Sequence, residues 1–427
     1  MGNSKRRATM LSTLKTNPNL RGLWFGETVS AVGSQITIIA LPLLAVVLLH
    51  ASPLDMGILG AFQFLPYLVI TPISGIIADR LKRRTILLSA NLCRGLLFFL
   101  IPFLALTRDL SLPIVYVVAF MLGSLGTFFD TTFWAFVPAV VGKESLESAN
   151  ARIVSSQSAA QVAGPGIGGV LVALITAPFA FAVNGFSYLF SSYQLSKIHV
   201  NEIVHKREES DKDTWKEMLL GFKIIFDNPV LRALLGEALT YNIFYQMVMA
   251  VFFIYTAVQL HLSPYVIGFA FSAGGLGAVM GSILAPGLAR RIGFGRALVS
   301  TMFLGNSVWI MLAFAENGGT LAVILIVLCL FLDGIGSAVS SVLSATVRQK
   351  IIPDRALARS MASNLTLAYG LMPLGSLIGG IVGETFGLQF TIVLGGIGIL
   401  SSSFWVLFSP LRKPSQEGDL NHLMEDQ

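Results

Sequence analysis

Residues 17–49 read NPNLRGLWFGETVSAVGSQITIIALPLLAVVLL, a polar pentapeptide followed by an apolar run that only Glu27 interrupts with a charge. A helix that crosses the hydrocarbon core of a bilayer needs about 20 apolar residues. The run from Gly22 to Leu49 meets this length. It is too long for the apolar core of a secretory signal peptide, and no small-residue cleavage site clearly follows it. The run therefore predicts a first transmembrane helix.

The same opening recurs in the second half of the chain. Residues 17–21 (NPNLR) and 228–232 (NPVLR) match at an offset of 211, and the Gly-Glu pair at 26–27 recurs at 236–237. Self-similarity at one long period indicates an internal duplication. Two parallel six-helix halves with a cavity between them form an arrangement used for alternating access.

Composition and the remaining apolar runs agree with a membrane protein. Hydrophobic residues make up 54% of the chain and charged residues 12%, against roughly 25% charged residues in soluble domains. Lipid must therefore be the solvent of most of the surface. We predict an all-α membrane protein with 12 transmembrane helices in two pseudo-symmetric six-helix bundles. The predicted spans are 22–49, 55–78, 85–106, 112–141, 153–175, 178–196, 232–258, 264–288, 298–315, 320–346, 360–382 and 388–409.

Basic residues predict the orientation of the chain in a cell inner (plasma) membrane. Of the 29 Lys and Arg residues, only Arg108 falls in a loop on the opposite side, and Arg94 lies inside a span. The positive-inside rule therefore places both termini in the cytoplasm. The net charge of +6 needs no nucleic acid to explain it. The predicted parts are a cytoplasmic arm (1–21), an N-terminal bundle (22–196), a cytoplasmic linker with an amphipathic helix (197–230), a C-terminal bundle (231–410) and a cytoplasmic tail (411–427).

Three motifs carry a resemblance to a known family. Residues 75–84 (GIIADRLKRR) closely resemble the major facilitator signature between helices 2 and 3. Residues 164–169 (GPGIGG) resemble the helix-5 motif associated with antiporters in that superfamily. Residues 136–151 (FVPAVVGKESLESANA) are similar to the subgroup that holds macrolide efflux proteins and siderophore exporters. The second-half copy of the loop motif departs from the first, because Arg290 stands where Asp79 would recur.

The resemblance implies a gate at the cytoplasmic end of helix 2. Asp79 would bind the positive N-terminus of helix 11, which is expected to begin near Arg359, and Arg83 could pair with Glu144. Basic loops could also serve orientation alone. The helix-5 motif would limit leak through the cavity, or serve plain close packing. The gating residues are Gly75, Asp79, Arg80, Arg83, Arg84 and Glu144, and the helix-5 residues are Gly164, Pro165, Gly168 and Gly169.

Four acids lie inside predicted spans, where a charge costs about 2.5–3.5 kcal/mol on insertion scales. They are Glu27, Asp130, Glu237 and Asp333. Glu27 and Glu237 occupy matching places near the starts of helices 1 and 7. We expect them to carry protons or bind a cationic substrate in the central cavity. The alternative is that each reaches the headgroups or pairs with Arg21 or Arg232.

The two other acids differ in their surroundings. Asp130 lies among aromatic residues, which suits coupling or recognition of a large amphipathic cation. Arg94, the one deep base, is expected to form a structural ion pair with it. Asp333 precedes Gly334 and Gly336. It could couple protonation to helix movement, or cap a kink through local hydrogen bonds.

The absence of other chemical patterns narrows the function. The sequence has no Walker A motif, no His/Cys metal cluster and no nucleophile–base pattern, so we expect no metal, no cofactor and no enzyme activity. We predict a proton-coupled exporter (antiporter) of an amphipathic drug, macrolide, siderophore or natural product, working by alternating access as a monomer in contact with membrane lipid. The alternatives are a lipid or lysolipid flippase and a non-transporting membrane sensor on the same fold.

Overall fold

The computed structural model describes residues 17–71, 81–142, 145–200, 222–315 and 319–412, together with residues 74 and 77. In the first half the helices are α2 (Pro18–Leu43), α3 (Pro53–Val69), α5 (Arg83–Thr107), α6 (Leu112–Val141), α7 (Leu146–Ile175) and α8 (Ala177–Ser196). In the second half they are α10 (Pro229–Ile254), α11 (Pro264–Ile292), α12 (Phe294–Met311), α13 (Thr320–Ile351), α14 (Asp354–Gly370), α15 (Met372–Phe386) and α16 (Leu388–Leu407).

The predicted fold class is confirmed. Within the described residues, 10 helical segments are long and apolar enough to cross a membrane, and α3 is a shorter apolar helix. The 20-residue α8 completes the predicted set. Helix 11 is divided into α14 and α15, since α14 ends at Gly370 and α15 begins at Met372. Helix 11 therefore starts at Asp354, the first residue of α14, which is six residues before the predicted start of the span at residue 360.

The repeated pentapeptide encodes a helix start in both halves. The Asn17 side chain accepts a hydrogen bond from the backbone N–H of Leu20 at 3.0 Å, and the Asn228 side chain accepts from Val230 at 2.9 Å. A proline follows each asparagine at the first helical position. There its missing N–H costs nothing and its fixed φ suits the helix.

The duplication extends to irregular features of the backbone. Both first helices end in a π-helical turn, at Leu44–Leu48 and at Tyr255–Gln259. His50 and His261 follow, each with a φ of 52°. These pairs keep the offset of 211 found in the sequence. The two halves therefore share local geometry as well as helix order.

Two pairs of helices make the most extensive contacts between the first half and the second. They are α7 with α11 and α3 with α15. In each pair a glycine faces a glycine: a Cβ on Gly268 would lie 2.9 Å from the Cα of Gly169, and a Cβ on Gly57 would lie 2.9 Å from the Cα of Gly380. Such close approach is typical of helix contacts built on small residues. Gly57 and Gly268 are related by the offset of 211, and so are Gly169 and Gly380.

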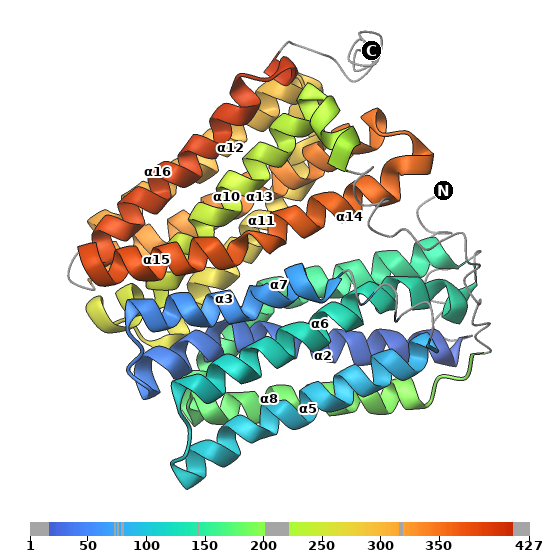
Figure 1. The fold of residues 1–427 in the computed structure, drawn as a ribbon, viewed down its shortest axis with the longest axis vertical. Helices are drawn as coiled ribbons and strands as arrows, with labels where there is room; N and C mark the ends of the chain where they lie inside the picture. The colour runs from blue at the N-terminus through green and yellow to red at the C-terminus, as the bar shows by residue number, and fades with distance from the viewer. Residues whose placement is uncertain are drawn as a thin grey trace.

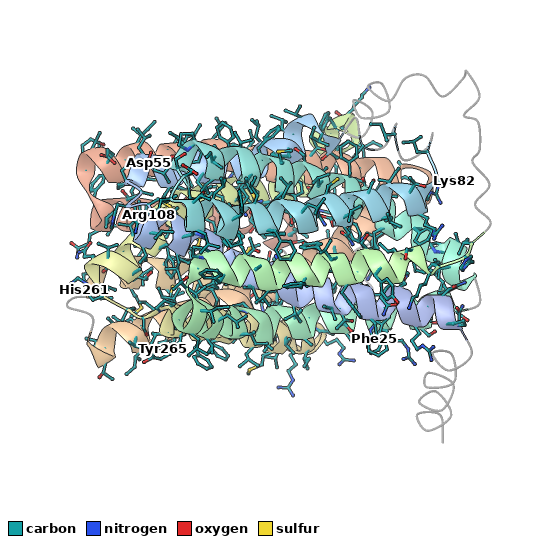
Figure 2. The ribbon with its side chains drawn as sticks, turned by 90° about the horizontal axis from the view of Figure 1, so that it is seen from below. Phe25, Asp55, Lys82, Arg108, His261 and Tyr265 are labelled. Carbon is teal, nitrogen blue, oxygen red and sulfur yellow. The ribbon has the colours of Figure 1, made fainter. Side chains whose placement is uncertain are left out.

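The two glycine–glycine contacts lie toward one end of the bundle. In Figure 1 the halves meet where α3 lies beside α15 and diverge toward α14. Figure 2 shows Asp55, Arg108 and His261 at one end of the bundle and Lys82 at the other. The closed end is the one predicted to face away from the cytoplasm.

Several predicted parts lie outside the described residues. These are most of the N-terminal arm, linker residues 201–221 and the tail from residue 413. At the end of the linker, residues 222–227 are helical, with Ile225 3% exposed and Phe226 50% exposed. Helix α3 ends at Val69, and most of the predicted remainder of its span to residue 78 lies outside the described residues.

Candidate functional site

Glu27 lies on α2 and faces α7. The Gln157 side chain on α7 donates a hydrogen bond from Nε2 to Glu27 Oε1 at 3.2 Å. One turn earlier, the Trp24 indole N–H donates to the Ser156 hydroxyl at 2.8 Å, which fixes α2 against α7. Asp130 lies within electrostatic range of the Glu27 carboxylate. Sequence reasoning named Glu27 but missed Gln157, which a search for amides within predicted spans would have found.

Asp130 lines a cavity of about 230 Å³ in the first half. Its side chain is exposed. Nearby, the rings of Tyr67 on α3 and Tyr369 on α14 stack across the two halves, with centroids 5.3 Å apart. Both tyrosines are in electrostatic range of Asp130. The carboxylate therefore lies close to the point where the two halves diverge. The remaining lining residues are Ser34, Thr37, Leu41, Gln63, Phe64, Arg94, Phe98, Ala119, Leu122, Gly123, Gly126 and Tyr188.

Arg94 lies between two aromatic rings. Its guanidinium carbon is 5.3 Å from the centroid of Phe129 and 5.2 Å from that of Tyr188. Gly126 leaves it room, because a Cβ there would lie 2.7 Å from Arg94 Nη2. No salt bridge with Asp130 is formed among the described residues, and the described partners of the guanidinium are the two rings. A cation–π contact contributes about 0.5–2 kcal/mol.

Glu237 is enclosed within the second half. Its side chain is 8% exposed. The basic residue in electrostatic range is Arg348 on α13. Arg232, the partner considered from the sequence, instead lies 3.4 Å from the Phe226 carbonyl, to which it donates a hydrogen bond. Glu27 and Glu237 therefore share a position in the repeat but differ in their partners.

Asp333 accepts two hydrogen bonds on the same carboxylate oxygen. The donors are the Tyr241 hydroxyl on α10 and the Trp309 indole N–H on α12, each at 2.9 Å. Neither donor is local to α13, so the kink-capping alternative does not describe this residue. The adjacent Gly334 and Gly336 pack α13 against α11 and α12, where added Cβ atoms would come within 2.1 and 2.7 Å of backbone carbonyl oxygens.

The described part of the gating motif binds backbone carbonyls of neighbouring helices. Arg83 Nη1 donates to the carbonyl of Ala135 on α6 at 2.8 Å. Arg84 donates from Nε to the Leu195 carbonyl at 3.1 Å, and from Nη2 to the Ser196 carbonyl. A cation at the C-terminus of α8 interacts favourably with the helix dipole. Gly75, Asp79, Arg80 and Glu144 lie outside the described residues, so the gate itself stays a prediction.

The helix-5 motif lies where α7 crosses both α2 and α11. A Cβ on Gly164 would lie 2.4 Å from the Cβ of Gln35 on α2, and one on Gly168 would lie 3.0 Å from a Cα of the same helix. Gly169 faces the other way, toward α11. The motif therefore packs the first helix on one side and the second half on the other. Its role in limiting leak stays a prediction.

The comparisons with known proteins indicate membrane export. A family model described as transmembrane secretion effector matches residues 8–426. The chain is 27% identical over 356 residues to the enterobactin exporter EntS of Citrobacter koseri, which covers 82% of this chain and 81% of that protein. It is 28% identical, with the same coverage, to the enterobactin exporter EntS of Escherichia coli O127:H6.

Solved structures of transporters share the fold. A bacterial homologue of the iron transporter ferroportin, in an inward-facing state, aligns with a TM-score of 0.66 at 17% identity and covers 91% of this chain and 98% of its own. The nucleoside transporter NupG aligns with a TM-score of 0.67 at 13% identity and covers 93% of this chain and 100% of its own. Among the described residues, no three His, Cys, Asp or Glu side chains gather in a way that could hold a metal ion.

Proposed function

The chain belongs to the transmembrane secretion effector family of major facilitator proteins, and on that premise we propose that it expels an amphipathic organic molecule in exchange for protons. The curated relatives are named as exporters of enterobactin, which supports export rather than uptake. A chain without a nucleotide-binding motif must draw its energy from an ion gradient.

The observation that supports proton coupling is a pair of carboxylates in the first half. Glu27 and Asp130 lie within electrostatic range of each other. Among the described residues Glu27 has a single side-chain donor, Gln157, and Asp130 has an exposed side chain beside a cavity. Two carboxylates within electrostatic range of each other disfavour double ionisation. Such a pair takes up one proton readily and loses it when a water path opens to the other side of the membrane.

The glycine contacts supply a way to alternate access. The halves touch through α7 with α11 and through α3 with α15, and small residues let each pair part without leaving large cavities. Proton binding and substrate binding would each favour one facing state, because a ligand shifts such an equilibrium only by its differential affinity for the two states.

Everted membrane vesicles test the proposal. A pH gradient is formed by respiration and followed with acridine orange while a macrolide, a catecholate siderophore or a lysophospholipid is added. We expect one added compound to accumulate in the vesicles and to dissipate the gradient. Glu27→Gln and Asp130→Asn should each abolish this coupling, because neither side chain can then release a proton.

A matched control is Glu147→Gln, which makes the same chemical change on an exposed residue in the first turn of α7. It should behave as the native protein does. Accumulation without proton movement, or coupling that survives in both cavity variants, would contradict proton antiport. Movement of only the lysophospholipid would favour the flippase.

A further inference from the structure

Arg94 is a buried cation that makes no hydrogen bond or ion pair with any described residue. Its side chain is 8% exposed and lines the cavity of about 230 Å³ that Asp130 also lines. Its guanidinium makes cation–π contacts with the faces of Phe129 and Tyr188. Aromatic faces attract the charge but accept none of the five N–H donors of a guanidinium. The donors at the cavity side are therefore available to a ligand.

The walls of the cavity fit an organic ligand rather than a bare ion. Phe64, Tyr67 and Phe98 line it together with the amide of Gln63. The Phe98 ring stacks on Tyr188 at 5.4 Å, so the aromatic wall continues from Arg94 into the cavity. Small-molecule sites are mostly apolar, with a few polar groups that fix the orientation of the ligand.

We propose that this cavity binds an aromatic organic anion, with its carboxylate on Arg94 and its ring among the aromatic walls. The inference rests on the proposed export function and specifies its substrate class. A planar guanidinium matches the geometry of a carboxylate and can form two parallel hydrogen bonds with it. Asp130 lines the same cavity and lies within electrostatic range of Arg94, although the two side chains form no hydrogen bond or salt bridge. Its negative charge opposes an anion and favours a cation.

Binding of three probes that share one ring system tests the charge preference. The full chain in lipid nanodiscs is titrated with 1-naphthoate, 1-naphthylmethylammonium and neutral 1-naphthamide, with empty nanodiscs subtracted. We expect 1-naphthoate to bind most tightly. Arg94→Gln should weaken 1-naphthoate by about tenfold, equivalent to about 1.4 kcal/mol, and should leave 1-naphthamide unchanged. Arg94→Lys should recover part of the loss, because the ammonium keeps the charge but lacks the planar fork.

A second variant separates recognition from folding. Asp130→Asn removes the opposing charge, so it should strengthen 1-naphthoate and weaken 1-naphthylmethylammonium. A misfolded protein cannot produce these opposite changes. The inference is overturned if the native protein binds the anion and the cation equally, or if Arg94→Gln weakens 1-naphthoate and 1-naphthamide alike. The latter result would make Arg94 a residue that only holds the fold.

Transport of the same probes distinguishes this inference from the function on which it rests. Export that moves the cation or the neutral probe but not 1-naphthoate would keep the exporter and overturn the anion site. Binding of 1-naphthoate through Arg94 without movement of any compound across the membrane would keep the anion site and overturn the exporter.

Discussion

Replacing Gly268 with alanine should shift the protein away from the state in which its halves meet at the closed end. The added Cβ would lie 2.4 Å from the carbonyl oxygen of Pro165 and 2.9 Å from the Cα of Gly169 on α7. Both are backbone atoms, so no side-chain rotation relieves the overlap. Overpacking of this kind costs about 1–3 kcal/mol. The penalty applies only while α7 and α11 touch, so it should change the balance of the two facing states by about 5- to 150-fold.

Distances between spin labels measure this balance. Two spin labels report the separation of the halves at the closed end. One replaces Asp109, between α5 and α6, and the other replaces Thr320, at the start of α13. Cys93 and Cys329 are first replaced by serine so that only the labelled cysteines react. In double electron–electron resonance, Gly268→Ala should move population from the short native distance to a longer one.

The same helix provides a matched control. A Cβ on Gly287 of α11 would meet nothing within 4 Å. Gly287→Ala should therefore leave the distances unchanged and gain some helix propensity. Gly334→Ala is a second control, because its Cβ would meet the carbonyl oxygen of Gly274 within the second half. It should lower stability without moving the halves. Unchanged distances in Gly268→Ala, or equal shifts in Gly287→Ala, would refute the reasoning.

Two further substitutions test individual contacts by thermal unfolding of the purified protein. Asp333→Ala removes the acceptor of the Tyr241 hydroxyl and the Trp309 indole N–H, so we expect the free energy of unfolding to fall by about 2–4 kcal/mol. Asp333→Asn keeps an acceptor oxygen and should lose less, and equal losses would contradict the assigned hydrogen bonds. Thr176 has a φ of 68°, where the equivalent residue of the second half is Gly387 with a φ of 90°. Thr176→Gly should relieve strain of about 1–3 kcal/mol and raise the free energy of unfolding. A lower free energy of unfolding would show that the strain is absent.

The helices and the duplication could be predicted from local signals. An asparagine followed by proline before an apolar run marks a helix start wherever it occurs, and it occurs at residues 17 and 228. Span lengths follow from the thickness of a bilayer. The break between α14 and α15 was not predicted, although Gly370 followed by Pro373 is a helix-stop pattern, because the apolar run continues through it.

The environment of Arg94 could not be predicted from the sequence. Phe129 and Asp130 are neighbours on α6, so their side chains project about 100° apart around the helix axis. A small rotation of α6 decides which of the two meets the guanidinium. Nothing in the local sequence fixes that rotation. It depends on how α6 packs against α3 and α5, and the outcome is a contact with Phe129.

The repeat also explains why the two halves differ around their first acids. The residue 211 positions after Gln157 is Ala368, which has no side-chain donor, and the residue 211 positions before Arg348 is Val137, which has no charge. Glu27 therefore accepts a hydrogen bond from a neutral amide, whereas Glu237 is enclosed in the second half with the cation of Arg348 in electrostatic range. A neutral amide can hydrogen-bond to either protonation state of a carboxyl group, but a nearby cation favours only the charged one. Duplication preserved the position of the acid along the helix, and substitution changed the side chains around each copy. The hydrogen bond from a neutral amide and the nearby Asp130 are the features that place the proposed proton site in the first half.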